Sequence, residues 1–84
     1  MHTRTWTVKI LISEENSMTK ARAVLSTDDT EGRVHGEGTA HTHPGEPNVP
    51  EIGDEIATSR ALSALAHALF DTAMNDVQAV LQKA

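Results

Sequence analysis

Apolar and polar residues alternate over most of the first half of the chain. The alternation covers residues 4–13, 18–27 and 33–41, and it is interrupted by polar segments at 14–17 and 28–32. A period of two is typical of half-buried strands, and the polar segments contain the residues that form tight turns. The pattern predicts a three-stranded antiparallel sheet. In the first strand, the inward-facing set is expected to be Trp6, Val8, Ile10 and Ile12.

The third predicted strand has an unusual inner face, because its alternating set is Val34, Gly36, Gly38 and Ala40. Glycine weakens an isolated strand, and it is often found where another backbone approaches closely. We therefore predict a trough at Gly36 and Gly38 in which a helix packs near the sheet. A bulge, or a ligand held against bare backbone, is the alternative interpretation.

After a loop that contains all three prolines of the chain, the hydrophobic period changes from two to 3.6. This change predicts one long helix over residues 50–82. Pro50 suits the first helical position, and the acidic Glu51, Asp54 and Glu55 suit the positive end of the helix dipole. One broad apolar stripe is expected to contain Ile52, Ile56, Leu62, Leu65, Ala66, Leu69, Phe70, Ala73, Val77, Val80 and Leu81. Gly53 is expected to lie in close contact with a strand or with the preceding loop.

The predicted helix is longer than the predicted strands. It would measure about 50 Å, whereas strands of this length span about 30 Å. The helix is therefore expected either to extend beyond the sheet or to break near residue 74, where Asn75 and Gln78 resemble a capping box. In both cases Val77, Val80 and Leu81 remain apolar beyond the sheet and are expected to need a partner.

Composition limits the class of protein. The 84 residues suffice for one domain, residues 1–84, with a thin core. Cysteine is absent, and neither a signal peptide nor a membrane-spanning apolar run is visible, so we expect a cytoplasmic protein. The net charge of −5 and the presence of two aromatic residues, Trp6 and Phe70, argue against nucleic acid as a partner.

Several segments have a specific sequence that can be compared with known families: residues 6–8 (WTV), 19–25, 36–40, 50–57 (PEIGDEIA) and 60–66 (RALSALA). Together they resemble a family of small uncharacterised actinobacterial proteins. The resemblance implies an α+β fold similar to the double-stranded-RNA-binding domain, and it assigns no activity and no catalytic residues. The order here is β-β-β-α, without that domain's first helix. Glu51, Asp54 and Glu55 stand where the RNA-binding domain has phosphate-binding lysines, so RNA binding is not expected.

Three groups of polar residues are candidate sites. Metal binding is considered for His41, His43 and Glu46, because imidazole and carboxylate bind divalent metals, although a solvated polar loop explains the same residues. A weak nucleic-acid contact on the open face of the sheet is considered for Lys9, Lys20, Arg22 and Arg33. Protection of the sheet against aggregation explains the same four residues, and the net charge favours that explanation. Arg60 is interpreted either as an ion-pair partner of Asp54 and Glu55 or as an interface residue.

The sequence contains no nucleophile and base at a recognisable spacing. This absence, the thin core and the apolar end of the predicted helix together favour a non-enzymatic module that self-associates or binds a protein. No catalytic residue, cofactor or membrane contact is expected. The predicted interface consists of Val77, Val80, Leu81 and Arg60. The alternatives are a weak nucleic-acid-binding module and a metal or small-ligand site at the 41–46 loop.

Overall fold

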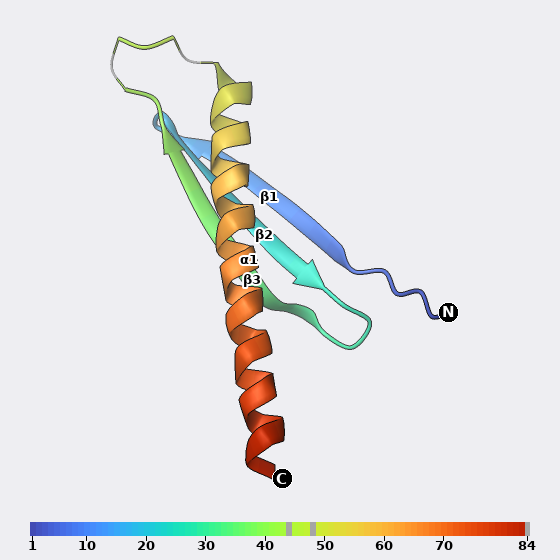
Figure 1. Cartoon of the computed structure of the whole chain (residues 1–84). Helices are drawn as coiled ribbons and strands as arrows, with labels where there is room; N and C mark the ends of the chain where they lie inside the picture. The colour runs from blue at the N-terminus through green and yellow to red at the C-terminus, as the bar shows by residue number, and fades with distance from the viewer. Residues whose placement is uncertain (44, 48, 84) are drawn as a thin grey trace.

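In the computed structural model, which describes residues 1–43, 45–47 and 49–83, a three-stranded sheet packs against one long helix (Figure 1). The elements are β1 (Thr7–Glu15), β2 (Met18–Ser26), β3 (Glu31–His41) and α1 (Pro50–Lys83). The strands are antiparallel in the order β1-β2-β3. This α+β architecture confirms the predicted fold, with element boundaries within a few residues of those expected. The molecule is elongated and measures 59 × 27 × 19 Å.

Both turns of the sheet follow from local sequence. Asn16 and Ser17 form a two-residue turn between β1 and β2, and both have positive φ angles of 50° and 63°. This is the backbone that matches the twist of a hairpin, and asparagine tolerates it well. In the second turn, the Thr27 amide donates a hydrogen bond to the Thr30 carbonyl at 2.8 Å. Gly32 then takes a φ of 74° at a shift in register between β2 and β3.

The helix and the sheet meet through small residues. Ala57, Ala61 and Leu65 of α1 are buried against β2 and β3. A Cβ atom built on Gly36 would lie 2.6 Å from the carbonyl oxygen of Ala61, and one on Gly38 would lie 2.6 Å from the Arg60 Cβ. The glycines therefore form the predicted trough, and the helix backbone fills it. The sheet side of this core is completed by Ala21, Ala23, Leu25 and Ala40.

The start of α1 also touches the sheet closely. A Cβ atom on Gly53 would lie 2.9 Å from Thr19 Oγ1 on β2, and Thr19 itself is buried. Gly53 therefore makes the predicted close contact with a strand. Of the two alternatives for the helix end, the break near residue 74 is wrong and the extension beyond the sheet is confirmed, because α1 continues through Asn75 and Gln78 to Lys83. Residues 54–84 contain neither glycine nor proline, so a capping pattern alone does not end the helix.

The expectation that β1 is half-buried is also wrong. The helix lies over β2 and β3 and scarcely touches β1, which crosses behind α1 at an angle (Figure 1). Val8 and Ile12 are 41% and 46% exposed, and Ile10 alone of the inward set is partly buried. A helix is about 10 Å wide and strands are about 4.8 Å apart, so one helix covers about two strands.

Candidate functional site

The helix carries a second apolar face, directed away from the sheet. Residues spaced by three and four along a helix share a side, and this spacing runs from Phe70 through Met74 and Val77 to Leu81. Ile52 and Ile56 lie on the same side at the start of α1. We call these six residues the outer face of α1. All six are exposed, from 39% at Ile56 to 69% at Leu81.

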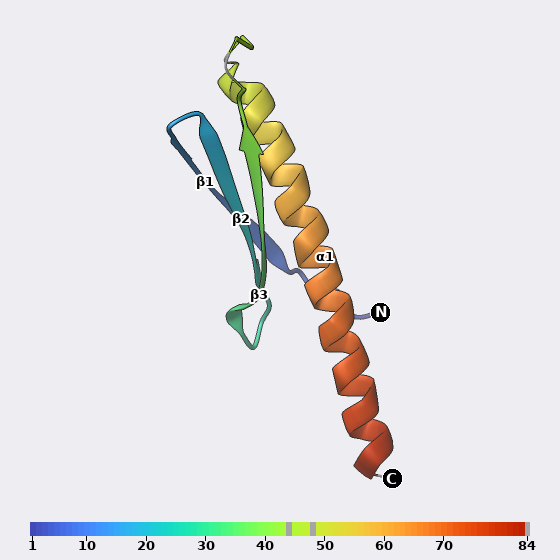
Figure 2. The ribbon, with the colours of Figure 1, turned by 90° about the vertical axis from the view of Figure 1, so that its left-hand side faces the viewer.

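The last turns of α1 extend beyond the sheet, as both ribbon views show (Figure 2). Leu69 is partly buried against the core, whereas all residues from 73 to 82 are exposed. We call residues 73–82 the overhang. Val77, Val80 and Leu81 lie there side by side and line a shallow apolar hollow together with Asp76. The structure thus brings together the three apolar residues that the sequence predicts as an interface.

Arg60 has a partner in its own chain. Its Nη1 donates a hydrogen bond to the Thr39 carbonyl at 2.6 Å, at the outer edge of the sheet formed by β3. The interpretation of Arg60 as an ion-pair partner of Asp54 and Glu55 is therefore replaced by a contact between helix and strand. This hydrogen bond satisfies an edge carbonyl that would otherwise bind water. Its predicted role at an interface between molecules stays a prediction.

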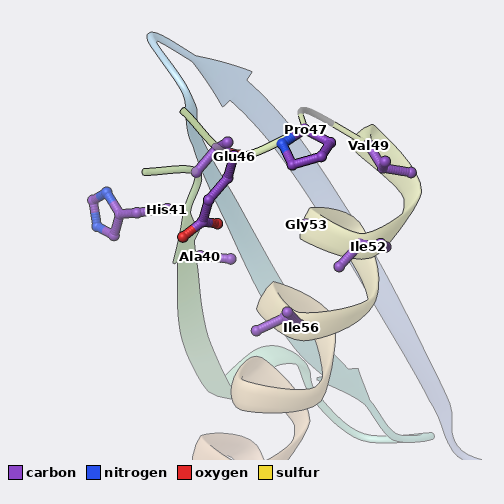
Figure 3. A pocket seen from close by; sticks show the side chains of 9 residues that line it. Ala40, His41, Glu46, Pro47, Val49, Ile52, Gly53 and Ile56 are labelled. Carbon is purple, nitrogen blue, oxygen red and sulfur yellow. The ribbon is translucent and has the colours of Figure 1, made fainter. Parts of the chain in front are cut away.

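A cavity of about 330 Å³ lies between the 41–46 loop and the start of α1 (Figure 3). Its lining is largely apolar, with Pro47, Val49, Ile52 and Ile56 as the larger contributors.

The predicted metal ligands do not converge in this cavity. The His41 ring points away from it, whereas the Glu46 carboxylate lies beside Ala40. His43 is not part of the lining, and Pro44 of the same loop lies outside the described residues. Among residues 1–43, 45–47 and 49–83, no three His, Asp or Glu side chains are grouped closely enough to hold a metal ion.

The four basic candidates are divided between two places. By strand register, Lys9, Lys20 and Arg22 share the open face of the sheet, and Arg22 stands opposite Glu37 on β3. Arg33 lies at the shift in register after Gly32, and it lines a hollow beside Leu69 and Asp76 of α1. The predicted stripe of four bases is therefore reduced to three, and one of them faces an acid.

Three polar side chains of α1 form hydrogen bonds within the helix. Ser59 and Thr72 donate their hydroxyls to the carbonyls of Ile56 and Ala68, and His67 Nδ1 lies 2.8 Å from the Ser63 carbonyl oxygen. Hydrogen bonds of this kind are ordinary for helix residues. As a separate point, no helix in the described part of the chain has the length and apolar character required to cross a membrane.

Sequence reasoning missed the division of α1 into two apolar faces. It assigned one stripe to residues that the structure separates: Leu65 is buried against the sheet, whereas Phe70 is 63% exposed on the other side. The signal was present, because five residues correspond to about 500° of helix rotation and place these two side chains about 140° apart. A stripe that broad is wider than one buried face.

Comparison with known proteins agrees with the resemblance seen in the sequence. The model of the Rv2632c-like family matches residues 4–84. Uncharacterized protein Mb1767 of Mycobacterium bovis is 41% identical over 75 residues, which cover 89% of this chain and 78% of that protein. Uncharacterized protein Rv2632c of Mycobacterium tuberculosis is 38% identical over 76 residues, which cover 90% and 80%.

The fold is shared with a solved structure. The crystal structure of Rv2632c superposes with a TM-score of 0.83 at 36% identity, covering 95% of this chain and 93% of that one. The more distant similarity to the double-stranded-RNA-binding domain stays a prediction. Family model, sequence identity and fold agree over nearly the whole chain, and the protein belongs to the Rv2632c-like family.

Proposed function

We propose that this protein is a non-enzymatic module that self-associates through the overhang of α1. The observation that carries the proposal is the exposure of Val77, Val80 and Leu81, which are 49%, 69% and 69% exposed beyond the end of the sheet. Contiguous apolar surface of this kind commonly marks a site of protein association.

Burial of these three side chains together would favour association. Each would contribute about 1.5–3 kcal/mol if fully buried, and in a monomer they remain largely in water. A second copy provides a matching surface, because a two-fold axis places one patch against itself. The small core strengthens this argument, since small domains often gain stability from association.

The non-enzymatic part of the proposal rests on the polar groups. The hydroxyls and the imidazole of α1 described above bond to carbonyls of the same helix, and the loop cavity is lined mainly by apolar side chains. General acid–base catalysis requires a titratable group positioned in a pocket beside the substrate. The side chains around the cavity provide one carboxylate, that of Glu46, without a converging imidazole.

Sedimentation velocity over a range of concentrations tests the proposal. We expect the parent protein to sediment as a dimer or larger species at micromolar concentrations. The double variant Val77→Asp with Leu81→Asp is expected to sediment as a monomer and to retain the circular dichroism of the parent. Two charges placed in an apolar contact would be desolvated without partners.

The matched control is Gln78→Asp with Gln82→Asp, which adds the same charges to the same turns on another side of the helix. This control is expected to associate like the parent. A parent protein that remains monomeric throughout the concentration range would refute the proposal, as would a Val77/Leu81 variant that associates normally.

A further inference from the structure

A heptad spacing runs along the solvent side of α1 from end to end. Steps of four and three residues connect positions 52, 56, 59, 63, 66, 70, 73, 77 and 80, and we call these nine positions the seam. Seven of them are apolar, and the exceptions, Ser59 and Ser63, are small. Apolar residues that repeat at this spacing over about four heptads are typical of a helix that packs lengthwise against another helix.

The helix's own sheet does not cover the seam. The opposite side of α1, represented by Ala57, Ala61 and Leu65, is already buried against β2 and β3. The seam residues are exposed along the whole helix, including Ile52 at its start and Phe70 in its second half. A helix that packs one face on its own sheet and exposes a heptad-spaced apolar face has the pattern of a helix that lies between that sheet and a further partner.

We propose that the seam is occupied by the seam of a second copy of this chain, with the two helices antiparallel. This inference rests on the proposed self-association and specifies its geometry. The two-fold axis passes near Ala66, the midpoint of the seam. Ile52 and Ile56 of one copy then lie near Val77 and Val80 of the other, so that the start of each helix helps to cover the overhang of its partner.

The distribution of charged residues along α1 favours an antiparallel over a parallel pair of helices. Glu51, Asp54 and Glu55 crowd the first turns of α1, whereas Asp76 is the one charged residue of the overhang at positions 73–82. Parallel helices would set two acidic clusters side by side, and like charges at close range repel. Antiparallel helices separate the clusters by nearly the length of α1 and oppose the two helix dipoles favourably.

Side-chain size agrees with this direction. The centre of the seam consists of Ser59, Ser63 and Ala66, all small. In the antiparallel pair, Phe70 of each copy meets this small-residue region of the other copy. Large residues facing small ones allow two helices to approach closely without voids.

A distance measurement between the two copies tests the geometry. The chain contains no cysteine, so Gln82→Cys provides one spin-labelling site on an exposed position away from the seam. Residue 82 lies 16 positions from residue 66, and two such lengths of helix give an expected label separation of about 50 Å by double electron–electron resonance. Parallel helices would bring the labels within about 20 Å of each other, since packed helix axes are about 10 Å apart.

The label result separates this inference from the proposed function. A separation of about 50 Å supports the antiparallel seam. A short separation would overturn the seam geometry while leaving self-association intact. Loss of all intermolecular dipolar modulation at concentrations where a dimer is expected would overturn both.

Variants at the start of the helix provide the second test. Ile52→Asp with Ile56→Asp lies far from the overhang, yet it is expected to weaken the dimer at least about tenfold in sedimentation, which corresponds to about 1.4 kcal/mol. Both Ile52 and Ile56 also line the loop cavity, so Ser63→Glu, at the seam centre, is a second variant that touches no part of that cavity. It is expected to weaken the dimer similarly, whereas Gln78→Glu, off the seam, is expected to leave it unchanged.

These variants have a clear contrary outcome. If Val77→Asp with Leu81→Asp dissociates the dimer while Ser63→Glu and the Ile52/Ile56 variant associate like the parent, contact is confined to the overhang. The full-length seam would then be rejected, and the proposed self-association would stand.

Discussion

Two glycines set the distance between the layers of this molecule. Gly36 and Gly38 lie on the inner face of β3, where the backbone of α1 between Ala57 and Leu65 occupies the space that side chains would need. The nearest neighbours are backbone atoms of a helix, which cannot move aside as the end of a flexible side chain can. Close packing of this kind makes even a single added methyl group costly.

We therefore expect Gly36→Val and Gly38→Val each to lower the free energy of unfolding by about 1–3 kcal/mol or more. Urea denaturation followed by circular dichroism measures this change. Glu37→Val is the matched control, because it adds a β-branched residue to the same strand on the open face. If both glycine variants melt within a degree or so of the parent, the trough interpretation is incorrect.

At the scale of elements, the packing of α1 is governed by its width and its crossing of the sheet. It covers β2 and β3, and it leaves the inner side of β1 to solvent together with Trp6 just before it. The start of the helix is fixed by a second close contact, between Gly53 and the buried Thr19 of β2. Glycine has a lower helix propensity than alanine, so the effect of this contact on the free energy of unfolding can be measured by substitution.

Gly53→Ala tests this contact in two backgrounds. Alanine within a helix is favoured over glycine by up to about 1 kcal/mol, less in the first turn, but here its Cβ would lie 2.9 Å from Thr19 Oγ1. We expect Gly53→Ala to give little or no gain in the parent. In a Thr19→Ala background, the same change is expected to raise the free energy of unfolding. Equal gains in both backgrounds, measured by urea denaturation, would show that Thr19 does not restrict this position.

At the scale of the whole molecule, charge and shape oppose the binding of polyanions. The net charge is −5, and the open face of the sheet carries three basic residues, with Glu37 beside Arg22. Binding to nucleic acid depends on neutralising several phosphates at once and weakens steeply with salt. A sparse, partly compensated group of bases satisfies that requirement poorly.

We expect no electrophoretic shift of duplex RNA at about 0.15 M salt and at most a weak shift at low salt. Lys20→Ala and Arg22→Ala are expected to change nothing at the higher salt concentration. Tight binding at that salt concentration, lost in either variant, would contradict this expectation and favour the nucleic-acid alternative.

Local chemistry was enough to predict most of the fold. The period of two in the strands, the turn residues around Asn16 and Gly32, and Pro50 with its acidic neighbours each act over a few residues. The sequence therefore determined the three antiparallel strands, the helix start and the exposed apolar end of α1. It also indicated the close approach at Gly36 and Gly38, because glycine within a strand often marks a place where another backbone comes near.

Tertiary structure decided which apolar face became the core. Periodicity shows that side chains share a side, but it cannot show how far a single helix reaches across a sheet. Leu65 packs on the sheet while Phe70 faces solvent, and Val8 is exposed because α1 lies over the other two strands. Arg60 likewise has acids nearby in sequence, yet it bonds to Thr39, 21 residues away. These outcomes depend on the crossing of α1 over the sheet, which brings together residues that no local pattern connects.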